Sequence, residues 1–138
     1  MKSLKLNRPS HQEIGRLLSA DNIEIKVLFS SDNPVLLGKT FQSKNIRVWK
    51  NKFSMEVCRE IVLNSVLDMA VTLKDVGRRY HLTGNVRSCA PLSGDEQYHL
   101  DIVLRERADI PTDYSAWHNH FDNNFQRRNE SQRDKPTV

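Results

Sequence analysis

The sequence predicts a single α+β domain, in which about four mostly antiparallel strands pack on a long central helix between shorter terminal helices. The main observation is the apolar run over 54–73, whose polar residues recur every four positions at Glu56, Glu60, Asn64 and Asp68. On an α-helix this spacing forms one narrow polar stripe, and the remaining circumference is apolar. Segments on both sides of the run alternate apolar and polar residues, which is typical of strands.

The predicted central helix begins at Ser54, a residue type that caps helix N-termini well, and Glu56 lies in its first turn. A helix that is apolar over most of its surface must be covered on several sides. We therefore expect Leu63 and Val66 to be buried, so that an aspartate at either position would unfold the domain.

The chain before this helix is predicted to contain one short helix and two strands. Residues 1–8 form a basic lead that we expect to be loose. Ser10 and Glu13 match a capping box and predict a helix that ends near residue 20. Residues 23–29 alternate as a half-buried strand does, and residues 45–50 predict a second strand.

Two further strands are predicted after the central helix, over 80–87 and 97–105, and we expect them to pair as an antiparallel hairpin. Gly84 lies in the middle of the first of these strands. A glycine at such a position indicates a β-bulge or a close contact with a neighbouring group.

An aromatic stripe predicts a last helix, which Pro111 to Asp113 can begin. Its members recur at spacings of three and four: Tyr114, Trp117, Phe121 and Phe125. Core packing is the commoner role of such a stripe, and a self-association surface that forms a homo-oligomer is the alternative. The domain is expected to span 1–125, and the polar segment 126–138 is expected to be a disordered tail.

Composition favours a basic intracellular protein. The 138 residues carry a formal charge of +4 and a pI near 9.2, which suits nucleic acid or an acidic membrane surface, although a basic domain without such a partner is as common. Cys58 and Cys89 provide neither a disulfide framework nor zinc spacing, and no signal peptide or membrane span is evident. We expect a cytoplasmic or nuclear location and no cofactor.

The strongest functional signal is a basic segment without an acidic residue between Asn33 and Met55, with aromatic residues interleaved. Cations neutralise phosphates, and aromatic rings can stack on bases or lie in a lipid interface. The predicted polyanion-binding residues are Lys39, Lys44, Arg47, Trp49, Lys50 and Lys52. The sequence thus predicts a non-enzymatic binding or assembly protein, whereas a solvated strand with scattered lysines is the alternative interpretation.

Other polar groups are weaker candidates. His81, His99 and Asp101 share the polar face of the predicted hairpin, and an imidazole beside a carboxylate permits acid–base chemistry in a small enzyme. No convincing nucleophile accompanies them, so no catalytic residue is predicted. His118 and Asp122 would share a helix face, but two residues do not make a metal site.

One family resemblance rests on the layout of the middle of the chain. The strand over 23–29, the turn SSDNP, a helix and then the segment HLTGNV form a succession that resembles rhabdovirus matrix proteins. The resemblance implies a viral structural protein that self-assembles and binds membrane or nucleocapsid. The proline-rich late-domain motif expected near the N-terminus of many such proteins is absent.

Overall fold

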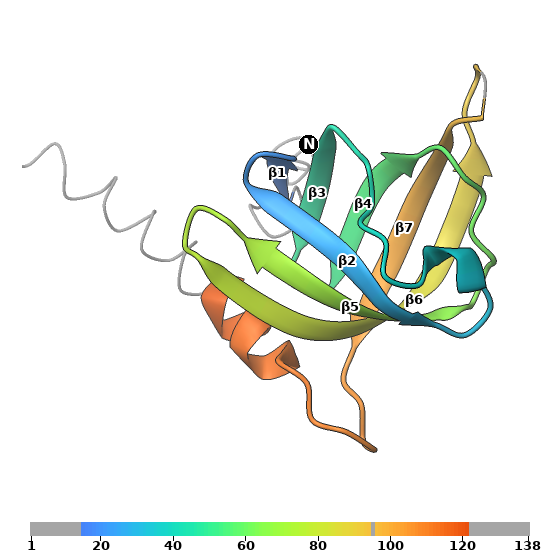
Figure 1. Cartoon of the computed structure of the whole chain (residues 1–138). Coiled ribbons are helices and arrows are strands. Elements are labelled where there is room, and N and C mark those ends of the chain that lie inside the picture. The colour runs from blue at the N-terminus through green and yellow to red at the C-terminus, as the bar shows by residue number, and fades with distance from the viewer. Residues whose placement is uncertain (1–14, 95, 122–138) are drawn as a thin grey trace, which may run out of the picture.

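The computed structural model describes residues 15–94 and 96–121, and its strands form one curled, seven-stranded antiparallel sheet (Figure 1). The strand order is β1-β3-β4-β7-β6-β5-β2. The strands are β1 (Arg16–Ser19), β2 (Ile23–Ser30), β3 (Asn45–Trp49), β4 (Lys52–Val57), β5 (Val66–Leu73), β6 (Arg78–Pro91) and β7 (Tyr98–Arg105). A 3-10 helix, η1 (Pro34–Leu36), and an α-helix over 114–121 complete the described elements. The predicted α+β class is wrong, because the fold is a β-rich half-barrel.

The predicted central helix over 54–73 does not exist. Its first residues belong to β4, its last belong to β5, and 58–65 is a connecting loop. A polar residue at every fourth position also lies on one face of a strand, because four is a multiple of the strand period of two. Leu67, Met69 and Val71 alternate into the interior of the sheet, and Asn64 interrupts any helix with a left-handed φ of 66°.

Two burial predictions fail together with the central helix. Leu63 lies in the connecting loop with 54% of its surface exposed, and Val66 begins β5 only partly buried. Leu67, one position further along, is completely buried. Leu63, which a helix would have placed in the core, is therefore on the surface. In β5 the core position belongs to Leu67 instead of Val66.

The predicted N-terminal helix is also wrong wherever the structure describes it. Residues 16–19 form β1, which pairs antiparallel with β3, Arg16 opposite Val48 and Ser19 opposite Asn45. Gly15 has a positive φ of 80°, which an α-helix does not allow. The Ser10 and Glu13 capping box lies outside the described residues.

Four predicted strands are confirmed: β2, β3, β6 and β7, the last two paired as the expected antiparallel hairpin. Gly84 marks a close contact, because a Cβ atom at this position would lie 2.6 Å from Cγ2 of Ile102. The β-bulge in this hairpin occurs nearby, between Val86 and Ser88. The expectation about Gly84 is therefore met by crowding between β6 and β7.

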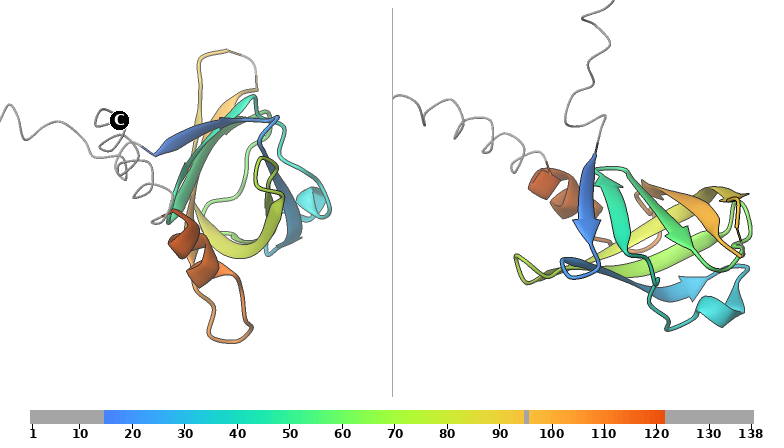
Figure 2. Two further views of the ribbon diagram at one scale, coloured as in Figure 1. Left: turned by 90° about the vertical axis from the view of Figure 1, so that its left-hand side faces the viewer. Right: turned by 90° about the horizontal axis from the view of Figure 1, so that it is seen from above.

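The sheet curls round on itself, as the left-hand view of Figure 2 shows, and the buried side chains of its strands form one core cluster. The predicted C-terminal helix is present over 114–121, and it packs where β6 continues past the end of β7. Two hydrogen bonds there pair the backbone amide and carbonyl of β6 that β7 does not reach. The amide of His81 donates to Oδ2 of Asp113 at 2.7 Å, and the amide of Asp113 donates to the carbonyl of His81 at 2.8 Å.

The residues between η1 and β3 cover the free edge of β2. The amide of Val27 donates to the carbonyl of Lys39 at 2.8 Å, and the amide of Phe41 donates to the carbonyl of Ile25 at 3.0 Å. An isolated bridge between Lys26 and Thr40 continues this pairing. The edge strand β2 is therefore not left as an open template for another chain.

Several expectations concern residues outside the described part of the chain: the basic lead 1–8, the tail 126–138, the domain boundary at 125, and Phe125. The helix in the rhabdovirus-like layout is replaced by strands and a loop, so that this part of the resemblance is lost. Within the described residues, no helix is long and apolar enough to cross a membrane.

Candidate functional site

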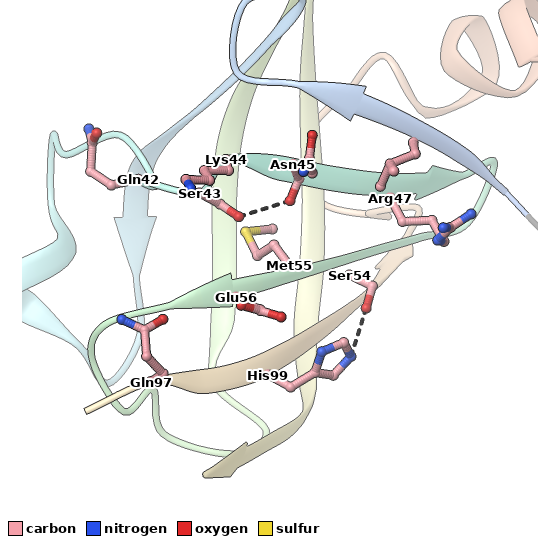
Figure 3. Close-up of a pocket in the computed structure, with 11 residues that line it drawn as sticks. Gln42, Ser43, Lys44, Asn45, Arg47, Ser54, Met55, Glu56, Gln97 and His99 are labelled. Atoms are coloured by element: carbon pink, nitrogen blue, oxygen red, sulfur yellow. Dashed lines mark hydrogen bonds between the residues drawn. The ribbon is translucent and has the colours of Figure 1, made fainter. Parts of the chain in front are cut away.

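A groove of about 620 Å³ lies on the outer face of the sheet, where β1, β3, β4 and β7 run side by side (Figure 3). We call it the outer groove. Its lining is mostly polar and comes from the strands and from the loops before β3 and β7. The lining residues are Leu17, Gln42, Ser43, Lys44, Asn45, Arg47, Ser54, Met55, Glu56, Gln97 and His99.

Two of the predicted cations line the outer groove directly. Lys44 is exposed in the loop just before β3, and its ammonium group has no ion-pair partner among the described residues. Arg47 lies opposite Leu17 on β1 and Ser54 on β4, so it occupies the outer face in the middle of the three strands. Strand alternation explains this placement, because Ile46 and Val48 on either side of Arg47 are buried in the core.

Trp49 and Lys52 extend the outer face next to the groove, and they contact each other. Nζ of Lys52 lies 4.4 Å from the centroid of the Trp49 ring. Gly15 packs closely against the same indole, since a Cβ atom on it would lie 2.7 Å from Cε2 of Trp49. Trp49 therefore serves to hold the start of β1 to the sheet, and the part of the ring that meets Gly15 is not accessible to a stacked base.

The other two predicted cations lie outside the outer groove. Lys50 lies in the turn between β3 and β4. Lys39 lies in the segment that covers the edge of β2, where its carbonyl accepts a hydrogen bond from Val27. The structure therefore separates Lys39 from the remaining predicted polyanion residues.

A hydrogen-bonded cluster forms one wall of the outer groove. Oγ of Ser54 lies 2.9 Å from Nε2 of His99, and Oδ1 of Asp101 lies 3.3 Å from the same nitrogen. The hydroxyl of Ser88 donates to Oδ2 of Asp101 at 3.0 Å. Burial would raise the pKa of Asp101, but hydrogen bonds from Ser54 and Ser88 and the charges of His99 and Lys52 together lower it. Asp101 is thus held as a carboxylate.

These residues do not form a serine-nucleophile triad. In such a triad, serine and aspartate contact different ring nitrogens of the histidine. Here Ser54 and Asp101 both approach Nε2, and Nδ1 has no hydrogen-bond partner among the described residues. His99 is therefore positioned by Nε2, and Nδ1 is the nitrogen left for other chemistry.

His81 and His99, which the sequence placed on one hairpin face, are far apart. His99 lies opposite Ala90 on β6, nine residues from His81, a separation of roughly 30 Å at about 3.3 Å per residue. His81 instead contacts Asp113 through its backbone. An enzyme that uses both histidines together has no support in this arrangement.

Glu56 is the groove residue that the sequence interpretation missed. It was assigned to the first turn of a helix, but it lies on the outer face of β4 directly opposite His99. The alternation of Lys52, Ser54 and Glu56 with Phe53 and Met55 is the signal that could have identified it.

The aromatic stripe faces inward in the described residues. Trp117 is completely buried, with ring centroids 5.6 Å from Phe53 and 5.2 Å from Tyr80 in edge-to-face geometry. Phe121 is buried as well, and Tyr114 packs on the edge of the core. Self-association through these residues stays a prediction. Because they pack in the core, they leave little aromatic surface exposed on this helix for a second chain to contact.

Metal-binding residue types do not converge in the part of the chain that the structure describes: no group of three His, Cys, Asp or Glu is placed to hold an ion. Comparisons with family models, with curated proteins and with solved structures found no match for this chain.

Proposed function

We propose that this protein binds the phosphate backbone of single-stranded nucleic acid along the outer groove. The observation that carries the proposal is that three cations gather on one face: Arg47 on β3, Lys52 on β4, and Lys44 in the loop just before β3. Arg and Lys neutralise phosphates, and the counterions that they release provide much of the binding free energy. The distribution of charge, more than the net charge of +4, thus supports an anionic ligand.

The acidic residues of this face leave the positive charges dominant. Asp101 lies behind His99, where Oδ2 accepts a hydrogen bond from Ser88 and Oδ1 faces Nε2 of His99 at 3.3 Å. Glu56 is the carboxylate that lines the groove itself. A linear polyanion can therefore approach Lys44, Arg47 and Lys52 with one acidic side chain in its path.

A nucleic acid suits the groove better than a membrane surface does. Membrane-binding surfaces combine cations with apolar side chains that enter the lipid interface. Of the large exposed apolar residues in the described structure, only Leu17 lines the groove; the others are Leu28, Phe29, Val35, Leu37, Val62, Leu63, Val76 and Ile110. Recognition through the backbone is favoured over base stacking, because Trp49 is occupied by Gly15 and Lys52.

The test compares two triple charge reversals of equal net charge. The first replaces Lys44, Arg47 and Lys52 by Glu on the groove face, and the second replaces Lys26, Arg59 and Arg79 by Glu at exposed positions elsewhere. Binding of fluorescein-labelled oligodeoxythymidylate is followed by anisotropy over a series of salt concentrations. Each phosphate contact on a single strand contributes about 0.7 to the slope of log K against log salt.

We expect the groove variant to lose most of its affinity and to lower the salt slope by about 2, corresponding to three contacts. The control variant should bind within a few-fold of the parent protein. Equal losses in both variants would show that net charge alone drives binding. Binding to anionic phosphatidylserine vesicles but not to the oligonucleotide would also contradict the proposal.

A further inference from the structure

Glu56 is out of place in a groove that only binds anions. A carboxylate that lines a phosphate site repels the ligand, and no ion pair or hydrogen bond of Glu56 is present among the described residues to offset this cost. Glu56 and His99 are direct cross-strand partners on β4 and β7, a relation that places their Cβ atoms about 5 Å apart. The groove therefore holds a carboxylate and an imidazole side by side, with cations around them.

His99 is positioned for proton transfer by the groups behind it. Ser54 and Asp101 contact Nε2 and fix the ring, while Nδ1 has no partner among the residues that the structure describes. The Asp101 carboxylate lies 3.3 Å from Nε2, so this nitrogen is turned away from the ligand side of the ring. Figure 3 shows the ring of His99 turned toward Ser54, with Glu56 further along the same strand β4.

We propose that the outer groove cleaves single-stranded RNA by internal transesterification, with Glu56 as general base and His99 as general acid. This inference rests on the proposed function, because the groove must first bind the RNA backbone. This reaction requires one group that removes a proton and another that supplies one, and a carboxylate and a protonated imidazole that line the same groove can fill these two roles.

The step is balanced by the two side chains and the substrate. The Glu56 carboxylate accepts the proton of the ribose 2′-hydroxyl, and the 2′-oxygen forms a bond to phosphorus. The bond between phosphorus and the 5′-oxygen breaks, and Nδ1–H of His99 gives its proton to that oxygen. The products are a 2′,3′-cyclic phosphate end and a 5′-hydroxyl end, and no redox partner takes part.

The neighbouring groups have supporting roles. Arg47 and Lys44, which line the same groove, stabilise the negative charge that accumulates on the phosphate oxygens in the transition state. Ser54 and Asp101 act as positioning residues through Nε2 of His99. DNA lacks the 2′-hydroxyl, so the groove binds single-stranded DNA without cutting it.

The experiment incubates the full chain with end-labelled single-stranded RNA in EDTA and analyses the products by gel and mass spectrometry. The same sequence as DNA and as 2′-O-methyl RNA provides substrates that can bind but not react. The variants are Glu56→Gln and His99→Asn, with Glu60→Gln as the matched control, because Glu60 is an exposed glutamate in the loop after β4.

We expect fragments that end in a 2′,3′-cyclic phosphate and a bell-shaped dependence of the rate on pH, because one group must be ionised and the other protonated. Glu56→Gln and His99→Asn should each lower the rate by about 10²- to 10⁴-fold. Both should bind 2′-O-methyl RNA at least half as tightly as the parent, and Glu60→Gln should cleave like the parent.

Two outcomes would overturn the inference while the proposed function stands. The first is tight binding of RNA that remains intact, and the second is cleavage that persists in both variants, which would come from a contaminating nuclease. Failure to bind any of the three oligonucleotides would instead remove the proposed function together with the inference.

Discussion

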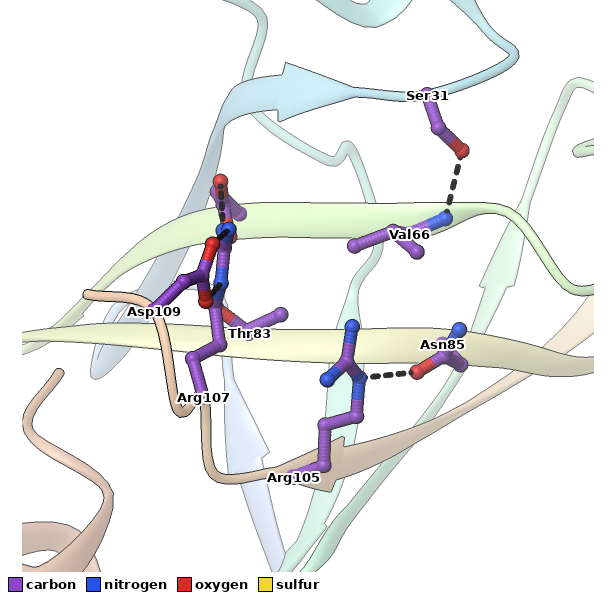
Figure 4. Close-up of polar contacts among 8 residues, drawn as sticks. Ser31, Val66, Thr83, Asn85, Arg105, Arg107 and Asp109 are labelled. Carbon is purple, nitrogen blue, oxygen red and sulfur yellow. Dashed lines mark hydrogen bonds and ion pairs between the residues drawn. The ribbon is translucent and has the colours of Figure 1, made fainter. Parts of the chain in front are cut away.

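The guanidinium of Arg107, which Figure 4 labels beside Thr83 and Asp109, clamps the carboxylate of Asp68 on the outer face of β5, with Nη1 3.1 Å from Oδ1 and 3.0 Å from Oδ2. The hydroxyl of Thr83 on β6 donates to the same Oδ1 at 2.7 Å. Asp109 also binds Arg107, with Nε of Arg107 2.9 Å from Oδ1. These contacts hold the segment that follows β7 against the sheet, and that segment leads directly to the helix over 114–121.

The first prediction concerns this clamp. Arg107→Met should lower the free energy of unfolding clearly more than Arg105→Met does, because it removes two charge-assisted hydrogen bonds to Asp68, which remains nearly buried without its partner. Arg105→Met is the matched control. Arg105 is exposed and bonds to Asn85, so its loss should change stability by less than about 0.5 kcal/mol. Urea unfolding followed by fluorescence gives both values, and equal values would show that the clamp is not important.

The second prediction concerns the helix over 114–121. Trp117→Ala should cost about 3–5 kcal/mol, because the ring is completely buried between Phe53 and Tyr80. Ser115→Ala on the exposed side of the helix should be nearly neutral. Thermal melts by circular dichroism distinguish the two variants. If Trp117→Ala melts with the parent protein, the helix does not belong to the cooperative core.

The third prediction separates the two interpretations of the run over 54–73. Leu67→Ala should cost about 2–5 kcal/mol, since Leu67 has no exposed surface, while the exposed Leu63→Ala should change stability by less than about 0.5 kcal/mol. A central helix would have required a large loss at Leu63. Denaturant midpoints of the two variants therefore decide between the strand arrangement and the helix.

The fourth prediction is a pH dependence of stability from Asp101. Its pKa is lowered from the ordinary 3.8 in the folded state, so it adds stability at a pH above that value. This contribution is lost as the pH falls from about 5 towards the folded pKa. Ser88→Ala removes one hydrogen bond to the carboxylate and should raise the pKa of Asp101.

The measurement is urea unfolding of the parent, Ser88→Ala and Asp101→Asn across the acidic range. The parent should lose stability most steeply on acidification, Ser88→Ala less steeply, and Asp101→Asn least of the three. Parallel curves for all three proteins would show that Asp101 is not linked to folding. The exposed Asp21→Asn is a suitable control, because it removes a carboxylate without touching this cluster.

The sequence by itself determined the segments with regular alternation. The strands β2, β3, β6 and β7 follow from period-two patterns that bury one face, and the aromatic spacing of Tyr114, Trp117 and Phe121 predicted the last helix. The β6–β7 hairpin followed from two neighbouring alternating segments. The sequence also indicated the basic outer face around β3, since Arg47 and the other cations of this face lie close together along the chain.

Only the tertiary structure decided between helix and strand for 54–73. Polar residues four apart satisfy both periods, so local pattern cannot distinguish the two, and pairing of β5 with β2 and β6 decides the result. The site depended on the same pairing. Glu56 meets His99 because β4 lies beside β7, and His81 is separated from His99 because β6 extends past β7. Such contacts between distant segments depend on register, which no single segment encodes.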